Sequence, residues 1–259
     1  MKLKLTLAVA IGIACCAVAE DSPGVKSPTP AERKAIGMQK AGGRIAVPNS
    51  QKGSIRILNA QSLLPASEVE AVADTIAKSD EYRFDVQPVP AKADVRSLLR
   101  GASNCVSVAI VDSQGDPSLT VVPDEGWAVI NVRPLAEGLA TEAATNTFFA
   151  SRCRKQLIRG IVLAATGTGS QYKRNFFWAK SIPDLDLFKE FLPMDSAGNL
   201  RERLADRGVT PRRYTVYARA CREGWAPTPT NDVQKAIWQQ VHQIPDKPIK
   251  IEFDPKKDK

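Results

Sequence analysis

A single long helix, predicted over residues 145–165, most constrains how this 259-residue chain can fold. Apolar side chains recur along it at helical spacing, and Phe149, Cys153, Ile161 and the neighbours Leu157 and Ile158 share one stripe. An apolar stripe of this length is unfavourable in water, because it exposes a large apolar area. We therefore expect the helix to run through the core.

Short apolar segments with turn signals between them come before this helix. Strands are predicted at residues 54–59, 84–89, 105–111, 119–122 and 127–132, with a hairpin loop at 123–126. Shorter helices are predicted after the long one, over residues 184–192, 199–207, 211–222 and 232–243. This order predicts an α/β protein of the α+β type, with one mixed sheet, a long core helix and a helical C-terminal extension.

The predicted organisation has four parts. Residues 1–19 form a signal peptide, 20–53 a flexible N-terminal tether, 54–170 the mixed α/β core domain, and 171–259 the helical extension with a final strand at 249–253. The tether is inferred because residues 20–53 are rich in Gly and Pro and show no apolar periodicity. We expect the folded protein to be a monomer.

The first nineteen residues have the pattern of an export signal. Lys2 and Lys4 precede an apolar run over residues 5–18, and small residues two apart lead to cleavage after Ala19. A lipoprotein with Cys16 acylated is the alternative. Cleavage removes two lysines and no acid, so the formal net charge falls from +8 to +6. We expect a basic, secreted or periplasmic protein with no membrane span.

Three cysteines remain after this cleavage: Cys105, Cys153 and Cys221. An odd number cannot all pair within the chain, so one disulfide and one free thiol is the most that internal pairing allows. This count excludes a disulfide-rich scaffold. Their pairing stays open at this point.

Residues 55–165 resemble the layout of archaemetzincins, a branch of the zincin metallopeptidases. In that family the active-site helix carries His-Glu-x-x-His-x-x-Gly-x-x-His, in which three His bind zinc and the Glu is the base. In the comparable stretch here, Arg159, Leu163 and Gly169 replace the three ligands, and Gly160 replaces the base. The resemblance therefore implies a zincin-like frame without its metal, and we expect no cofactor.

A second resemblance covers the C-terminal part of the chain, from residue 214 to residue 238. It is similar to a family of exported proteins of gut Verrucomicrobia. This likeness implies export and indicates no activity.

Two Asp-Ser-x-Gly segments begin at Asp112 and Asp195. They loosely resemble the loops of aspartic peptidases, in which two carboxylates share a proton so that one is the base and the other the acid. This interpretation makes Asp112 and Asp195 the catalytic pair of a secreted hydrolase, a peptidase acting on mucin-type protein; a degenerate zincin is the other form that such a peptidase could take. The alternative is that both segments are turns, since Asp, Ser and Gly are common turn residues.

The sharpest local bias is in charge. No acid lies between Glu142 and Asp184, while seven basic residues do. Within that stretch Arg152, Lys155 and Arg159 recur at helical spacing on one face of the long helix. Later in the same stretch, basic residues are interleaved with aromatic ones, and we take Lys173, Arg174 and Trp178 as further binding residues.

A basic face of this kind predicts a non-catalytic binding protein. Its partner would be acidic: an anionic glycan, a mucin or a nucleic acid. The alternatives are the hydrolase described above and a solvated helix face with no ligand.

Overall fold

The structure is a computed structural model that describes residues 29–77, 81–90, 93–100, 103–139 and 147–243. The predicted signal peptide and the predicted strand at 249–253 lie outside these residues, and so does Cys16. The chain divides into two compact units. One unit is residues Ile45–Thr215, and the other combines Met1–Arg44 with Val216–Lys259. None of the described helices is both long enough and apolar enough to cross a membrane.

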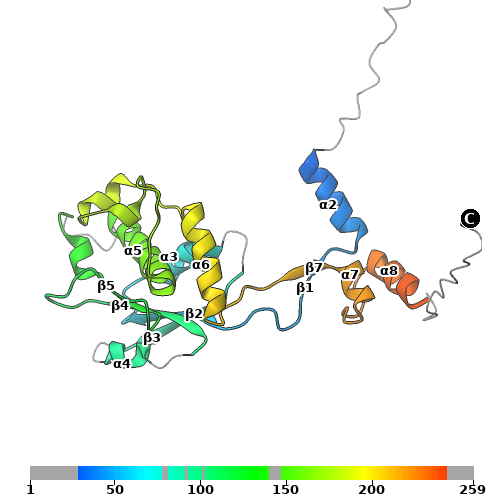
Figure 1. Ribbon diagram of the computed structural model, residues 1–259, viewed down its shortest axis with the longest axis horizontal. Coiled ribbons are helices and arrows are strands. Elements are labelled where there is room, and N and C mark those ends of the chain that lie inside the picture. The colour runs from blue at the N-terminus through cyan, green and yellow to red at the C-terminus, as the bar shows by residue number, and fades with distance from the viewer. Residues whose placement is uncertain (1–28, 78–80, 91–92, 101–102, 140–146, 244–259) are drawn as a thin grey trace, which may run out of the picture. The chain divides into compact units, whose positions relative to one another are not determined.

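The larger unit is built on a five-stranded mixed sheet (Figure 1). Its strands are β2 (Ser54–Ala60), β3 (Phe84–Val89), β4 (Cys105–Val111), β5 (Leu119–Val122) and β6 (Trp127–Asn131), in the spatial order β3-β2-β4-β6-β5. The first four in this order are parallel, and β5 pairs antiparallel with β6. The five strands predicted between residues 54 and 132, their hairpin and the mixed α/β class are confirmed.

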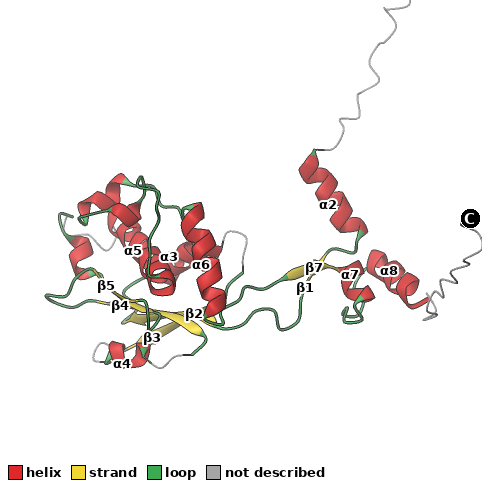
Figure 2. Ribbon diagram, viewed as in Figure 1, coloured by secondary structure: helices red, strands yellow, loops and turns green. Residues whose placement is uncertain are grey.

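The long helix α5 (Thr147–Thr166) packs on one face of the sheet, together with α3 (Ala66–Ala77) and α6 (Met194–Asp206) (Figure 2). Leu157, Ile158 and Ile161 are fully buried there, as their stripe predicts. Gly160 lets the helix approach closely: a Cβ at this position would lie 3.4 Å from Ile130 Cδ1. The core therefore lies between α5 and the sheet.

The opposite face of the sheet is covered in part by the short helix α4 (Val95–Leu99). The side chain of Asp94 caps this helix by accepting a hydrogen bond from Ser97 N at 3.2 Å. Leu99 is buried in a small apolar cluster with Leu58, Ala109 and Trp127. The sheet thus has an apolar layer on both faces, as is usual for a largely parallel sheet.

The tether expected over residues 20–53 is wrong in its later part. Residues Pro30–Lys40 form helix α2, and β1 (Arg44–Ala46) pairs with β7 (Tyr214–Val216) in a two-stranded sheet. The partner of β1 lies far along the chain, so no local pattern indicates it. The same unit as α2 contains α7 (Tyr217–Arg222) and α8 (Asp232–Gln243).

Residues 171–215 also differ from the expectation of a separate extension, because they belong to the larger unit. They include two 3-10 helices, η3 (Phe176–Trp178) and η4 (Pro183–Leu187), and helix α6. Asp195 lies in the first turn of α6, so its Asp-Ser-x-Gly segment is helical and forms no loop.

Candidate functional site

Arg152 was expected on an open basic face, and this expectation is wrong. Its side chain is 3% exposed. The Nη2 and Nε atoms donate to the Asp186 carboxylate at 2.6 and 3.0 Å. Nη1 donates to the carbonyls of Leu135 at 2.9 Å and Glu137 at 2.7 Å. A guanidinium with its donors used in this way holds segments of the protein together and has little left for a ligand.

Lys155 is likewise buried, with 4% of its surface exposed, and its Nζ donates to Leu185 O at 2.8 Å. Burial lowers the pKa of Lys155, although nearby carboxylates oppose this shift. Arg154 forms ion pairs with Glu68 and Glu190. The stretch contains no acidic residue of its own, but the fold brings acidic residues of α3 and of the segment around η4 against its basic side chains.

Arg159 differs from these residues. Its Nη1 donates to Gln156 Oε1 at 3.2 Å, while its Nε atom is buried and has no hydrogen-bond partner among the described residues. The described part of the chain provides no ion pair to this guanidinium. Burial lowers the pKa of Arg159, and no carboxylate of the described residues counteracts this shift. It is a partly buried cation with unused donors.

A cavity of about 310 Å³ lies beside Arg159, and we call it the Arg159 cavity. It is lined by Ser118, Leu119, Gln156, Arg159, Ala179, Lys180, Ser181 and Ile182. These residues come from the start of β5, the middle of α5 and the segment between η3 and η4. The lining carries two cations and no acid, and the nearby Asp184 carboxylate is bound to the backbone of Lys180 and Ser181. The guanidinium side of the cavity therefore favours an anion.

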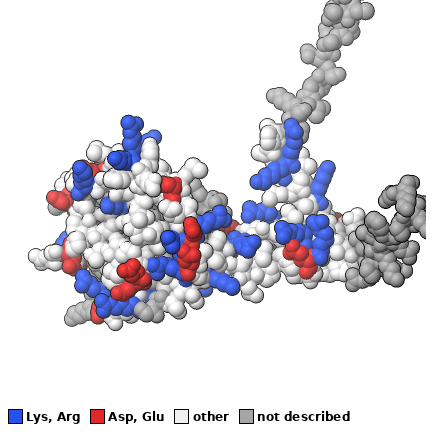
Figure 3. Space-filling model, viewed as in Figure 1, with Lys and Arg blue, Asp and Glu red and all other residues white. Residues whose placement is uncertain are grey.

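The remaining predicted binding residues lie on the loop before and within η3. Lys173 and Arg174 are exposed, and Trp178 is 47% exposed. The Lys173 Nζ lies 5.9 Å from the ring centroid of Trp178, and the Trp178 Nε1 donates to Ser170 O. Over the larger unit, Figure 3 shows acidic side chains among the basic ones on the face in view. Because Arg152 and Lys155 are buried, the predicted basic helix face is not formed as expected.

Asp112 and Asp195 have separate surroundings. Asp112 forms an exposed ion pair with Arg133, with the Oδ1 atom 2.6 Å from Arg133 Nε. Asp195 accepts hydrogen bonds from Gln171 N at 2.7 Å and Ser170 Oγ at 3.0 Å. Although desolvation opposes it, these bonds lower the pKa of Asp195. Among the described residues the two carboxylates have no hydrogen-bond partner in common, so these contacts do not form a pair that shares a proton.

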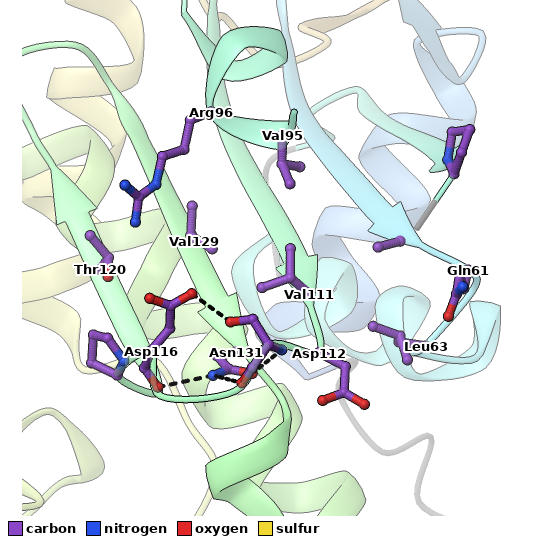
Figure 4. Close-up of a pocket in the computed structure, with 14 residues that line it drawn as sticks. Gln61, Leu63, Val95, Arg96, Val111, Asp112, Asp116, Thr120, Val129 and Asn131 are labelled. Atoms are coloured by element: carbon purple, nitrogen blue, oxygen red, sulfur yellow. Dashed lines mark hydrogen bonds between the residues drawn. The ribbon is translucent and has the colours of Figure 1, made fainter. Parts of the chain in front are cut away.

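Asp112 lines a second cavity, of about 200 Å³, on the α4 face of the sheet (Figure 4). We call it the strand-end cavity. Asn131, which the sequence reasoning missed, is 1% exposed and organises its loop. The amide nitrogen donates to Ser113 O and Asp116 O, both at 2.9 Å, and the amide oxygen accepts from Ser113 N at 3.1 Å. A buried polar residue at the end of an apolar strand is the signal that could have found it.

Comparison with known proteins gives a likeness to solved structures alone. An archaemetzincin from Methanopyrus kandleri is 16% identical, with 62% of this chain and 99% of that chain covered at a TM-score of 0.44. A zinc-dependent peptidase from Methanocorpusculum labreanum is 11% identical, with 56% and 99% covered at a TM-score of 0.40. An archaemetzincin from Archaeoglobus fulgidus is 14% identical, with the same coverage and a TM-score of 0.38. No family model and no curated protein matches the sequence.

The chain is thus similar in structure to archaemetzincins at low sequence identity, and this likeness concerns the fold alone. The similarity to a Verrucomicrobial family stays a prediction. The residues predicted to replace the zinc ligands do not fit a metal: Arg159 is a cation, Leu163 is apolar and Gly169 has no side chain. Within the described ranges, no three His, Cys, Asp or Glu side chains gather closely enough to hold a metal ion.

Proposed function

We propose that this protein is a non-catalytic binding protein that recognises an acidic group through the Arg159 cavity. The observation that carries the proposal is the buried Nε of Arg159, which has no hydrogen-bond partner in the described part of the chain. An unpaired, partly buried cation costs folding free energy unless a partner compensates it. An anionic ligand group would supply that compensation.

The chemistry of the lining supports an oxyanion. A guanidinium presents donors in a planar fork that matches a carboxylate, sulfate or phosphate. Lys180 adds a second cation at the cavity. Gln156 and Ser118, joined by a 3.2 Å hydrogen bond from Gln156 Nε2 to Ser118 Oγ, add polar groups beside it. These neutral groups suit the hydroxyls that surround the charge of an acidic sugar.

The size of the cavity favours a glycan over a nucleic acid as the partner. Its volume of about 310 Å³ accommodates one anionic group and its immediate surroundings. A nucleic acid would need cations spaced along its backbone, and Arg152 and Lys155 are buried in internal contacts. We therefore propose the terminal acidic sugar of a mucin-type glycan as the ligand class. A secreted or periplasmic location is part of the same proposal.

Calorimetric titration tests the proposal. We expect the protein to bind sialyllactose and to bind lactose at least about tenfold more weakly, because lactose lacks the carboxylate. Affinity for sialyllactose should fall between about 50 mM and about 200 mM salt. Heparin and an oligonucleotide serve as the sulfated and the phosphate-bearing competitors.

Substitution locates the site. Arg159→Gln should lower the affinity for sialyllactose at least about tenfold, since a charged hydrogen bond is lost. Arg203→Gln is the matched control, because Arg203 is an exposed arginine paired with Asp206 and does not line the cavity. Equal binding by wild type and Arg159→Gln, or equal binding of lactose and sialyllactose, would refute the proposal. Stronger binding of the oligonucleotide than of sialyllactose would indicate a nucleic acid as the partner in place of a glycan.

A further inference from the structure

The strand-end cavity lies where the chain diverges. After β2 the chain passes through α3 to β3 at one edge of the sheet, and after β4 it goes to β5 and β6 at the other edge. Ala60 and Gln61 at the end of β2, and Val111 and Asp112 at the end of β4, all line the cavity. In sheets of this type, ligands bind outside the carboxyl ends of the strands at such a switch point.

The floor of this cavity is apolar. Val111 and Val129 extend from neighbouring strands, and Val95 contributes from α4 (Figure 4). All three side chains are only partly buried, so they retain apolar surface that a ligand can cover. Covering such surface is favourable by roughly 25 cal/mol for each Å² removed from water.

Two opposite charges, those of Arg96 and Asp116, lie beside this floor. Arg96 extends from α4 past Val129 toward Thr120 and Asp116 (Figure 4). The described residues give the Arg96 guanidinium no ion pair. Asp116 accepts one hydrogen bond on its Oδ2 atom, from Ser113 Oγ at 2.6 Å, and this bond fixes the direction of the carboxylate. The Asp112 carboxylate is held by Arg133 and points away from this space in Figure 4.

The loop that carries Asp116 is held in place from below. Asn131 is 1% exposed, and its amide bonds the backbone of Ser113 and Asp116 in three places. A fourth bond comes from Arg133 N at 3.2 Å. Because every donor and acceptor of this amide is used, the loop keeps one shape without a ligand. Such a preformed arrangement reduces the entropic cost of binding.

We propose that the strand-end cavity binds a free α-amino acid with an apolar side chain. Its carboxylate pairs with Arg96, its ammonium group pairs with Asp116, and its side chain covers Val111 and Val129. The cavity volume of about 200 Å³ is below the range of about 300–1,000 Å³ found for drug-sized ligands, which suits a molecule of this size. This site is separate from the Arg159 cavity and does not depend on the function proposed for it.

Three related ligands test the two charged contacts by calorimetry. L-leucine carries both charges, N-acetyl-L-leucine lacks the ammonium group, and L-leucinamide lacks the carboxylate. We expect L-leucine to bind at least about tenfold more tightly than either derivative, since each derivative loses one charged contact. Equal binding of the three, or no saturable binding of L-leucine at millimolar concentration, would overturn the proposal.

Two substitutions assign each contact to its residue. Arg96→Gln should lower the affinity for L-leucine at least about tenfold. It should leave the affinity for L-leucinamide unchanged, because that derivative has no carboxylate to pair with Arg96. Asp116→Asn should lower the affinity for L-leucine and leave the affinity for N-acetyl-L-leucine unchanged. The Asn side-chain oxygen can still accept the hydrogen bond from Ser113, so the loop should keep its shape. Arg100→Gln is the control, because Arg100 is exposed, pairs with Glu125 and does not line the cavity. L-leucine affinity that is the same in wild type and both variants would place the ligand elsewhere.

Discussion

The two halves of α5 carry similar charges and use them in opposite ways. In the first half, Arg152 and Lys155 are buried, and Arg152 is bound to the Asp186 carboxylate. Two turns further on, Arg159 has a buried nitrogen with no partner among the described residues. A run of basic residues in the sequence therefore does not by itself indicate an exposed basic surface. Acids that are distant in sequence decide which of the cations remain available.

The first prediction concerns Arg152 and has the largest expected effect. Arg152→Met should lower the free energy of unfolding by about 3–5 kcal/mol, because Asp186 and two carbonyls lose their partner in a dry environment. Denaturant unfolding measures the change. The double variant Arg152→Met with Asp186→Leu should recover part of the loss. A decrease below about 1 kcal/mol would show that Arg152 is more hydrated than its contacts indicate.

The second prediction tests how dry the first half of α5 is. Desolvation raises the pKa of the Cys153 thiol to about 12, with a smaller contribution from Glu68. The unfolded chain loses this proton near pH 9, while the folded protein keeps it, so the stability contributed by this group is lost as the pH rises from 9 to 12.

The expected slope from this thiol is about 1.4 kcal/mol for each pH unit in that window. The difference in unfolding free energy between wild type and Cys153→Ala, measured at several pH values, isolates the contribution of this thiol. A difference that does not change between pH 9 and pH 12 would mean that water reaches this part of the helix.

The third prediction concerns Arg159, for which we expect the opposite sign. Arg159→Met should raise the free energy of unfolding by about 1 kcal/mol, because it removes a charge that is desolvated without compensation. Thermal unfolding measured beside Arg152→Met gives the contrast directly. A loss of more than about 1 kcal/mol would reveal a stabilising partner for this guanidinium and would contradict the difference drawn between the two halves of α5.

The smallest effect is expected on the exposed loop. Lys173→Ala should change the free energy of unfolding by less than about 0.5 kcal/mol, since this side chain is exposed and lies over the Trp178 ring. Denaturant unfolding is again the measurement. A larger loss would show that the Lys173 contact with Trp178 stabilises the loop around η3.

Local patterns were enough to predict much of the larger unit. Alternating and continuous apolar segments gave the strands, and the observed helix Thr147–Thr166 lies within two residues of its predicted bounds. These predictions succeeded because the spacing of apolar residues indicates which face of a strand or helix is buried. The pairing of β1 with β7 is set by residues about 170 positions apart, so no local pattern could indicate it.

The candidate sites could be predicted only in part. Arg159 was selected from the sequence, but so were Arg152 and Lys155, and no spacing rule separates them. Their fates depend on Asp186 and on the carbonyl of Leu185, which a different segment brings against α5. Asn131 and Arg96 were missed, because a single polar residue on a strand or short helix is common. Their role at the strand-end cavity depends on the loops that the fold brings together at the end of the sheet.

Gly160 has a consequence for both the stability of the core and the depth of the Arg159 cavity. Gly160 faces the sheet, where an added Cβ would already be in van der Waals contact with Ile130 and Val108, and Arg159 is its immediate neighbour on that helix. An alanine Cβ would make ordinary contacts with Ile130 and Val108, but a side chain longer than alanine at position 160 would have to push α5 outward or displace them. The reach of the guanidinium relative to β5 would then change along with the packing, so fold and recognition cannot vary independently at this point of the chain.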